Sequence, residues 1–210
     1  MTLSLIYILE RFNIVKIDIY FMFNYKKYKW FFAKSGKLIV GGKSAESNDS
    51  LLTELKKMRK DLIIMHTKSA GSPFCAIIAP QETITTEDLQ ECAIFTGCFS
   101  RAWREGKKST LVHSFKINQL EKEKDMKSGT WKVNGKVKNF KVNLRLAITF
   151  QNNIVRAVPE NSVNDDEIIA FVVPGKIDKT KIKIGSIKTN REQLISALPA
   201  GGVKIETRNS

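Results

Sequence analysis

A histidine followed by a short polar loop is the part of this sequence that most readily suggests chemistry. His66 ends an apolar run, and Lys68, Ser69 and Ser72 follow it closely. General acid–base catalysis would need a carboxylate within hydrogen-bonding reach of the imidazole, and Asp61 is the acid that precedes it. Three interpretations stay open for His66: a catalytic residue, a structural residue that fixes the loop, and a polar contact to a bound ligand.

Other enzyme and metal-site motifs are absent from the sequence. It contains no nucleophile elbow, no phosphate-binding P-loop and no Gly-x-Gly-x-x-Gly fingerprint. Two histidines and three cysteines without a Cys-x-x-Cys pair make a zinc site improbable. An odd number of cysteines argues against a disulfide framework and fits a reducing, cytoplasmic compartment. We therefore expect no catalytic residue, no metal and no cofactor.

Positive charge is the outlying feature of the composition. The 210 residues include 35 Lys and Arg against 21 Asp and Glu, a formal net charge of +14. Net charge bears on partners, so the candidates are nucleic acid, an anionic membrane surface and an acidic protein. Residues 101–145 hold 13 basic and 4 acidic residues, whereas residues 81–100 hold four acids and no basic residue. This segregation predicts one basic face, as expected for phosphate binding.

Aromatic residues are interleaved with the basic stretch, at Trp103, Phe115, Trp131 and Phe140. Rings beside Lys and Arg suit single-stranded or looped RNA, whose unstacked bases can stack on them. The same rings could instead pack in the core. A second basic cluster supports the hypothesis only if it lies beside the first; its members are Lys26, Lys27, Lys29, Lys34, Lys37 and Lys43.

The spacing of apolar residues predicts the elements that position these side chains. Strand-like runs occupy residues 30–33, 37–40, 61–67, 74–79, 110–117, 130–133, 144–150 and 168–173, and helical spacing occupies residues 46–58, 86–104 and 191–198. Asn134-Gly135 is a hairpin signal. We expect an α+β fold: a mixed or antiparallel sheet, one long helix and one shorter helix packed on it, and a small C-terminal appendage.

Both ends of the chain stand apart from this pattern. Residues 1–23 are apolar, but four charged residues interrupt them, so they do not form a 20-residue membrane span. They are either an extra element or a leader ahead of a start at Met22. A composition change near Val158 suggests three parts: the leader at 1–23, a main domain at 24–158 and an appendage at 159–210.

Five short motifs follow one another in a fixed order between Lys29 and Phe140. They are Trp30-Phe31; Ser35-Gly36 with Leu38–Lys43, Ala45 and Asn48; Asp61, His66 and Gly71-Ser72-Pro73; Phe99–Trp103; and Gly129–Lys136. Their order and spacing resemble the RNA-binding domain of NFACT proteins, also called DUF814, in a stand-alone form. Two positions differ from the family pattern: Trp131 replaces a Phe, and Thr67-Lys68 replaces an acidic pair.

The resemblance implies binding to tRNA or ribosomal RNA, in ribosome-associated quality control, with the large ribosomal subunit as a further candidate partner. The expected RNA-binding residues are Lys43, Asn48, His66, Lys68, Ser72, Arg101, Trp103, Arg104, Lys107, Lys108, Trp131, Lys132, Lys136 and Lys138. Two alternatives remain: a protein-interaction adaptor on the ribosome and an enzyme centred on His66. We expect no membrane partner, and the sequence leaves the oligomeric state open.

Overall fold

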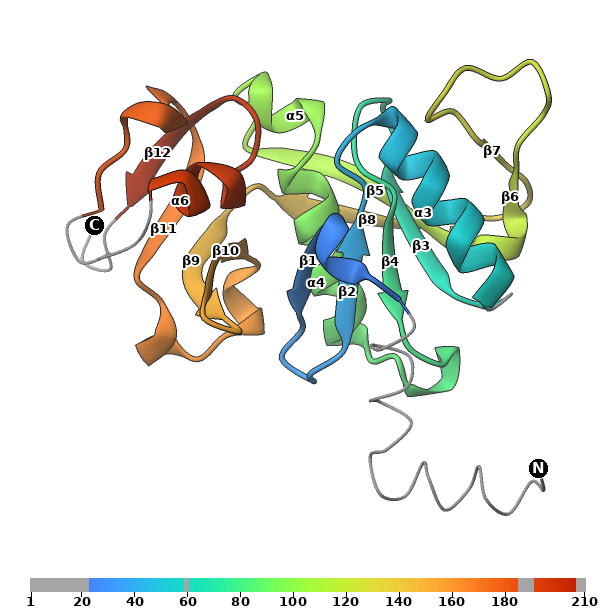
Figure 1. Ribbon diagram of the computed structural model, residues 1–210, viewed down its shortest axis with the longest axis horizontal. Helices are drawn as coiled ribbons and strands as arrows, with labels where there is room; N and C mark the ends of the chain where they lie inside the picture. The colour runs from blue at the N-terminus through green and yellow to red at the C-terminus, as the bar shows by residue number, and fades with distance from the viewer. Residues whose placement is uncertain (1–22, 59–60, 185–190, 207–210) are drawn as a thin grey trace, which may run out of the picture.

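The computed structural model describes residues 23–58, 61–184 and 191–206 (Figure 1). Apart from Phe23, which is buried, the expected leader lies outside these ranges, and so does Met22. Within the described ranges, no helix is both long and apolar enough to cross a membrane.

A six-stranded sheet carries the first half of the fold, in the order β1-β2-β4-β3-β5-β8. Its strands are β1 (Lys29–Phe32), β2 (Leu38–Gly41), β3 (Ile63–Thr67), β4 (Cys75–Ile78), β5 (Ser109–Lys116) and β8 (Lys138–Asn143). All neighbouring strands are antiparallel, and β1 and β2 form the expected hairpin. β2 and β4 are buried on both faces, which explains why their sequences are apolar throughout rather than alternating.

One long helix covers each face of this sheet. On α3 (Ala45–Met58), three buried leucines face Trp30, Val40 and their neighbours; they are Leu51, Leu52 and Leu55. On α4 (Thr86–Cys98), the buried residues pack with Phe31, Ile39 and Met65 on the other face. A capping box between Thr85 and Asp88 begins α4.

A second sheet lies beside the first (Figure 1). It has four strands in the order β10-β9-β11-β12. They are β9 (Leu146–Gln151), β10 (Ile154–Val158), β11 (Ala170–Asp178) and β12 (Gly202–Glu206), and α6 (Arg191–Ala197) packs against β10. Its buried residues, including Val155, Val172 and Val203, belong to the same hydrophobic cluster as Phe95 of α4. The C-terminal sheet therefore shares a core with the six-stranded sheet.

The remaining elements are short. β6 (Leu120–Glu121) pairs with β7 (Lys132–Val133) next to the C-terminal end of α3. Single 3₁₀ turns occupy η1 (Tyr25–Lys27), η2 (Gln81–Thr83), η3 (Ile117–Gln119), η4 (Glu160–Ser162), η5 (Asp165–Glu167) and η6 (Lys179–Lys181).

The α+β fold expected from the sequence is confirmed, but the expected helix 86–104 is divided. Ser100 has an extended backbone (φ −96°, ψ 175°), and a separate helix α5 (Arg101–Arg104) follows it. The Ser100 hydroxyl accepts a hydrogen bond from the amide of Ala102, so Ser100 is the N-cap of α5. The break turns Arg101 and Arg104 away from the axis of α4.

Strand pairing differs from the sequence prediction at two further places. Asn134-Gly135 does not close a hairpin, because β7 pairs with β6 whereas β8 pairs with β5. The turn is instead held by the side-chain amide of Gln119, which donates to the carbonyls of Asn134 and Lys136. The boundary expected at Val158 falls inside the second sheet, because β9, which precedes it, pairs with β11, which follows it.

Candidate nucleic-acid interface

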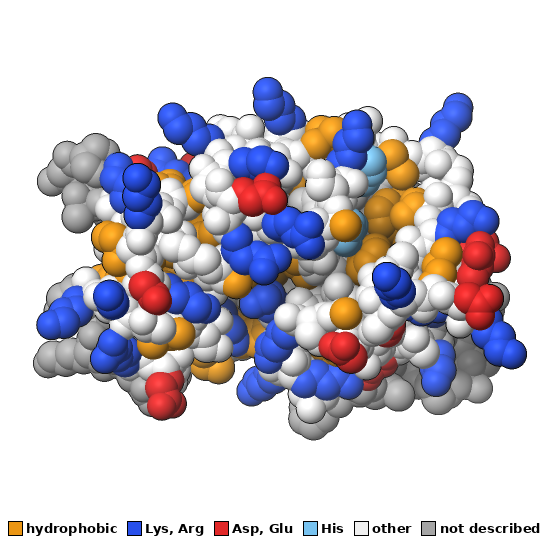
Figure 2. Space-filling view, turned by 90° about the horizontal axis from the view of Figure 1, so that it is seen from above, with side chains coloured by type: hydrophobic (Ala, Val, Ile, Leu, Met, Phe, Trp, Pro, Cys, Tyr) orange, Lys and Arg blue, Asp and Glu red, His pale blue; other side chains and the backbone are white. Residues whose placement is uncertain are grey.

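A cavity of about 690 Å³, here called the α3 pocket, opens where β2 and β3 end and α3 begins. Figure 2 shows it from above as a hollow with histidine at its edge and Lys and Arg side chains around it. Its walls come from the start of α3, the β3–β4 loop, β5, the start of α5 and residues 128–131. Residues from four of the five motifs that are separate in the sequence therefore meet at this one pocket.

The wall formed by α3 depends on Gly42 and Asn48. Asn48 is buried, and its side-chain oxygen accepts a hydrogen bond of 3.0 Å from the amide of Phe74. A Cβ at Gly42 would lie 2.0 Å from that oxygen, so only glycine fits. Asn48 lines the pocket, but its carbonyl oxygen is occupied in joining α3 to the β3–β4 loop.

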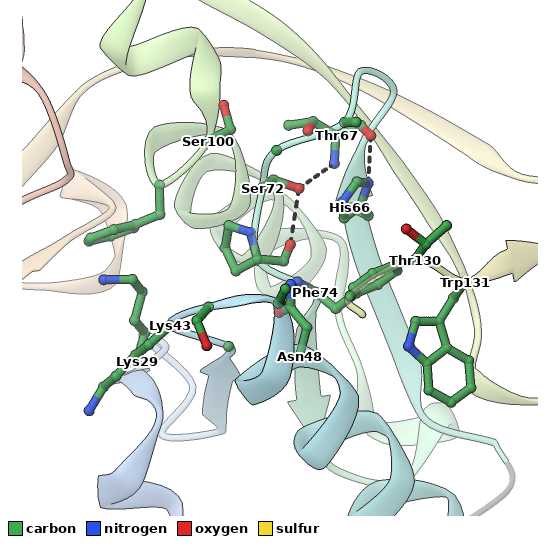
Figure 3. A pocket seen from close by; sticks show the side chains of 18 of the residues that line it. Lys29, Lys43, Asn48, His66, Thr67, Ser72, Phe74, Ser100, Thr130 and Trp131 are labelled. Carbon is green, nitrogen blue, oxygen red and sulfur yellow. Dashed lines mark hydrogen bonds between the residues drawn. The ribbon is translucent and has the colours of Figure 1, made fainter. Parts of the chain in front are cut away.

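The β3–β4 loop is held by its own hydroxyl groups (Figure 3). The Ser72 hydroxyl accepts a 3.0 Å hydrogen bond from the amide of Thr67 and donates to the carbonyl of Pro73. The Thr67 hydroxyl donates to the carbonyl of Ser69 over 2.6 Å. Gly71 has φ +102°, a conformation that side chains other than glycine rarely adopt. Ser72 is therefore a loop-fixing residue, whereas Lys68 in the same loop is exposed.

His66 packs against an aromatic ring inside the pocket. Its ring centroid lies 4.4 Å from that of Phe74, and Nδ1 lies 2.7 Å from the carbonyl oxygen of Thr67. A carbonyl oxygen can only accept a hydrogen bond, so Nδ1 carries the proton. In the neutral ring, the unprotonated Nε2 can then accept a hydrogen bond. Burial lowers the pKa of His66 from its usual value, and His113, its cross-strand partner, lowers it further. His66 is therefore neutral near pH 7.

Four cationic side chains line the α3 pocket: Lys29, Lys43, Lys68 and Arg104. Among the described residues that line it, none is an aspartate or a glutamate. The pocket therefore offers no carboxylate to pair with His66 as a general base, and its electrostatic character favours an anionic ligand. Of the second basic cluster, Lys29 and Lys43 line this pocket, and of the basic stretch 101–145, Arg104 does.

Trp131 forms part of the opposite wall and is held by Asp49. The indole N–H donates to Asp49 over 2.7 Å, and the amide of Gly129 donates to the same carboxylate over 2.9 Å. Lys122 forms an ion pair with Asp49 at 3.2 Å. Burial acts to raise the pKa of Asp49, but the hydrogen bonds from Gly129, Trp131 and Lys122 outweigh it and lower that pKa.

The sequence did not single out Asp49. Its signal is weak, because a single aspartate near the start of a helix ordinarily faces solvent. Phe74 and Lys29 line the pocket but were not among the site residues expected from the sequence. Lys29 is exceptional, because burial and the charges of Lys179 and Lys43 lower its pKa to about 8.

Trp103 needs a correction. Its ring is 1% exposed, and its indole N–H donates over 3.0 Å to the carbonyl of Gly202 in β12. A ring this deeply packed offers no face to a base, so the alternative interpretation as a core residue holds. Its function is to join α5 to the second sheet.

The other expected RNA-binding residues divide by position. The α3 pocket brings together Lys43, Asn48, His66, Lys68, Ser72, Arg104 and Trp131. Arg101 lies next to it, since its amide donates to the carbonyl of Gly71. The remaining lysines are exposed but do not line the pocket; they are Lys107, Lys108, Lys132, Lys136 and Lys138. Of these, Lys107 pairs with Glu105 at 2.6 Å and Lys132 with Glu123 at 3.1 Å.

Comparison with known proteins gives a family match over the part of the chain that builds the pocket. The family model described as the NFACT protein RNA binding domain matches residues 27–135. The archaeal Rqc2 homolog aRqcH of Methanocaldococcus jannaschii is 30% identical over 115 residues, which are 53% of this chain and 17% of that protein. The chain thus spans less than a fifth of the curated relative that it matches.

A solved structure gives a weaker match. The C-terminal part of the fibronectin/fibrinogen-binding protein from Streptococcus suis is 20% identical, with a TM-score of 0.49. The match covers 68% of this chain and 47% of that one.

Proposed function

The chain belongs to the NFACT RNA-binding domain family, and from this premise we propose that it binds RNA at the α3 pocket. The cationic residues of the rim contact phosphates, and the pocket receives an unstacked base. The observation that carries the proposal is a cavity lined by Lys29, Lys43, Lys68 and Arg104 with no acid among its described lining residues.

The interior of the pocket fits a base better than a simple ion. A flat polar ring, His66, lies over Phe74, and the half-buried ring of Trp131 lines the same cavity. Base–aromatic stacking contributes about 1–3 kcal/mol per base in single-stranded RNA complexes. The free Nε2 of neutral His66 can accept a hydrogen bond from a ribose hydroxyl or an exocyclic amine. The arrangement supports recognition of a looped or single-stranded segment.

We extend the proposal to the kind of RNA and the cellular setting that the family resemblance implies. The name of the archaeal relative marks it as a homologue of Rqc2, and we take the same setting, ribosome-associated quality control, as part of the proposal. The RNA is then a tRNA or a ribosomal RNA, the large ribosomal subunit is a candidate partner, and the location is cytoplasmic.

The experiment compares two double variants with the same change in net charge. Lys68→Gln with Arg104→Gln removes two cations of the rim, whereas Lys176→Gln with Lys181→Gln removes two exposed cations that line neither the α3 pocket nor a second cavity described below. Fluorescence anisotropy with a tRNA transcript is measured between about 50 and 200 mM salt.

The rim variant should lower the slope of log K against log salt by about two, since each phosphate contact releases a counterion. The control variant should leave that slope unchanged. Equal losses in the two variants would mean that only the net charge matters and that the α3 pocket is not the binding site.

A further inference from the structure

A second cavity, of about 530 Å³, lies between the first strand of the six-stranded sheet and the C-terminal sheet. We call it the cation cleft. Residues of η1, β1 and α4 line one side, and residues of β10 and α6 line the other. It shares three lining residues with the α3 pocket, namely Lys29, Lys43 and Phe99. The two cavities are therefore neighbours.

Arg156 of β10 is the central cation of this cleft. Its guanidinium carbon lies 3.8 Å from the ring centroid of Trp30, so the planar group stacks on that ring. Its Nε is buried and has no hydrogen-bond partner among the described residues. Burial lowers the pKa of Arg156 to about 10, and it still carries its charge near neutral pH. A buried donor without an acceptor is costly unless a ligand supplies one.

Two lysines, one on β1 and one in the turn between β2 and α3, line the same cleft. Lys29 Nζ lies 4.5 Å from the ring centroid of Phe99, and burial together with Lys179, Lys43 and Arg156 depresses its pKa. Burial and then Arg156 likewise lower the pKa of Lys43. These effects show that the three positive charges lie near enough to repel one another.

Three other charged groups lie near these cations: Lys179, Lys26 and Glu192. Lys179 is already bonded, since its ammonium donates to the carbonyls of Ile195 and Leu198. Lys26 adds a further cation to the lining, and Glu192 of α6 is the acid among the described lining residues. Glu192 is exposed and is not among the groups that shift the pKa of Lys29, Lys43 or Arg156.

We infer that the cation cleft is a binding site for a phosphoryl group, held by Lys29, Lys43 and Arg156. These donors come from β1, from the turn between β2 and α3, and from β10, so they approach one anion from different sides. A tetrahedral dianion can accept from all three, with the planar guanidinium as the bidentate partner. Arg156 lies beyond residues 27–135, so the C-terminal sheet supplies a ligand from outside the part of the chain that the family model matches.

Two sources can supply this phosphoryl group. One is the backbone of an RNA whose neighbouring nucleotide occupies the α3 pocket, and this source rests on the proposed function. The other is a free phosphate ion or a small phosphorylated molecule, which does not. Arg156 lines the cleft but not the α3 pocket, so substituting it separates the two sites.

The test measures two ligands on the full chain. Isothermal titration with inorganic phosphate compares wild type, Arg156→Gln, Lys43→Gln and the control Lys181→Gln. Loss of one charge-assisted contact should weaken phosphate binding about tenfold or more in the first two variants and not in the control. Lys43 is exposed, so Lys43→Gln keeps the test valid if Arg156→Gln fails to fold.

The second arm follows a tRNA transcript by anisotropy over the same variants. If Arg156→Gln lowers the slope of log K against log salt by about one, and wild type does not bind inorganic phosphate, the RNA backbone is the source of the phosphoryl group. Phosphate binding that is lost in Arg156→Gln while wild type binds no RNA would overturn the proposed function and keep this inference. Two results would overturn the inference. One is that neither phosphate binding nor the slope of log K against log salt for the tRNA changes in Arg156→Gln and Lys43→Gln. The other is that the protein binds neither ligand.

Discussion

Individual side chains at the α3 pocket divide into those that hold the backbone and those that remain available to a ligand. Asn48 and Ser72 are buried, and their side-chain oxygens form hydrogen bonds with backbone groups of Phe74, Thr67 and Pro73. Lys68 and Arg104 are exposed on the rim. Substitutions in the first group should therefore act through stability, and substitutions in the second through affinity and its dependence on salt.

Trp131 offers a direct test of stacking at the residue scale. Trp131→Phe keeps an aromatic ring but loses the indole N–H that bonds to Asp49 over 2.7 Å. Trp131→Ala removes the ring. If a base stacks there, the alanine variant should lose about five- to 150-fold in RNA affinity, and the phenylalanine variant less than about threefold. Anisotropy at one fixed salt concentration measures both, and equal affinities for the two variants would contradict stacking.

Glu91 carries the clearest prediction about pH. Its carboxylate is 2% exposed and accepts a 3.1 Å hydrogen bond from the amide of Lys34. Burial, together with the nearby charges of Asp88 and Glu87, raises its pKa to about 7 against that bond. A raised folded pKa means that its contribution to stability is fully present below about pH 4.5 and is lost as the pH rises through about 7.

Glu91→Gln keeps the accepting oxygen and removes the charge. The variant should have the wild-type melting temperature at about pH 5 and should melt several degrees higher at about pH 8.5. Differential scanning calorimetry at the two pH values measures the change. The same shift in Tm at both pH values would show that the charge of Glu91 is not the cause.

For individual residues, the sequence predicted which side chains lie near one another better than it predicted what each side chain bonds to. It brought Asn48, His66 and Ser72 to one site, because the motif order fixes which loops meet. It could not show that Asn48 and Ser72 would bond to backbone groups, since their partners Phe74 and Thr67 depend on tertiary contact. Trp103 was misplaced for the same reason: its partner, Gly202, is 99 residues away.

At the scale of elements, the break between α4 and α5 determines the positions of Arg101 and Arg104. Ser100 caps α5 and also donates to the carbonyl of Gly97 over 2.6 Å. A serine between two helical stretches was a usable signal for this break, but the continuous apolar spacing of residues 86–104 concealed it. Arg104 reaches the α3 pocket because the break exists.

A matched pair of cap substitutions tests this link. Ser100→Ala and Thr85→Ala each remove a side-chain cap, at α5 and α4 respectively, and each should cost about 1 kcal/mol of stability. Only Ser100→Ala should weaken RNA binding, because only α5 carries residues of the pocket rim. Thermal melting and anisotropy give the two readouts, and an equal effect on RNA affinity would contradict the role of α5.

Four strands were not predicted from the sequence: the two-residue β6, and β8, β10 and β12. β8 is rich in lysine, because it forms one edge of the six-stranded sheet and charged side chains protect an edge from unwanted pairing. Lys138 on β8 thus has a structural explanation besides RNA binding. β12 pairs with β11, from which α6 separates it in the sequence. β10 pairs with β9 through the two-residue turn at Asn152 and Asn153, both of which have positive φ.

At the scale of the whole molecule, the charge run from Arg101 to Arg145 does not form the rim of the pocket. Of its 13 basic residues, Arg104 lines the α3 pocket, whereas Lys107 and Lys132 pair with acids. The other cations that line it come from three distant segments, at Lys29, Lys43 and Lys68. Clustering along the chain is therefore a poor guide to clustering in space when antiparallel strands reverse direction every few residues.

The central claim is that RNA lies in the α3 pocket, and ultraviolet crosslinking tests it most directly. The protein is crosslinked to a bound tRNA transcript, and the crosslinked residues are mapped by mass spectrometry. We expect crosslinks in residues 66–74 and 128–131, which carry His66, Phe74 and Trp131. Crosslinks confined to β11, β12 and the lysines of β8, with none in these two segments, would contradict the account.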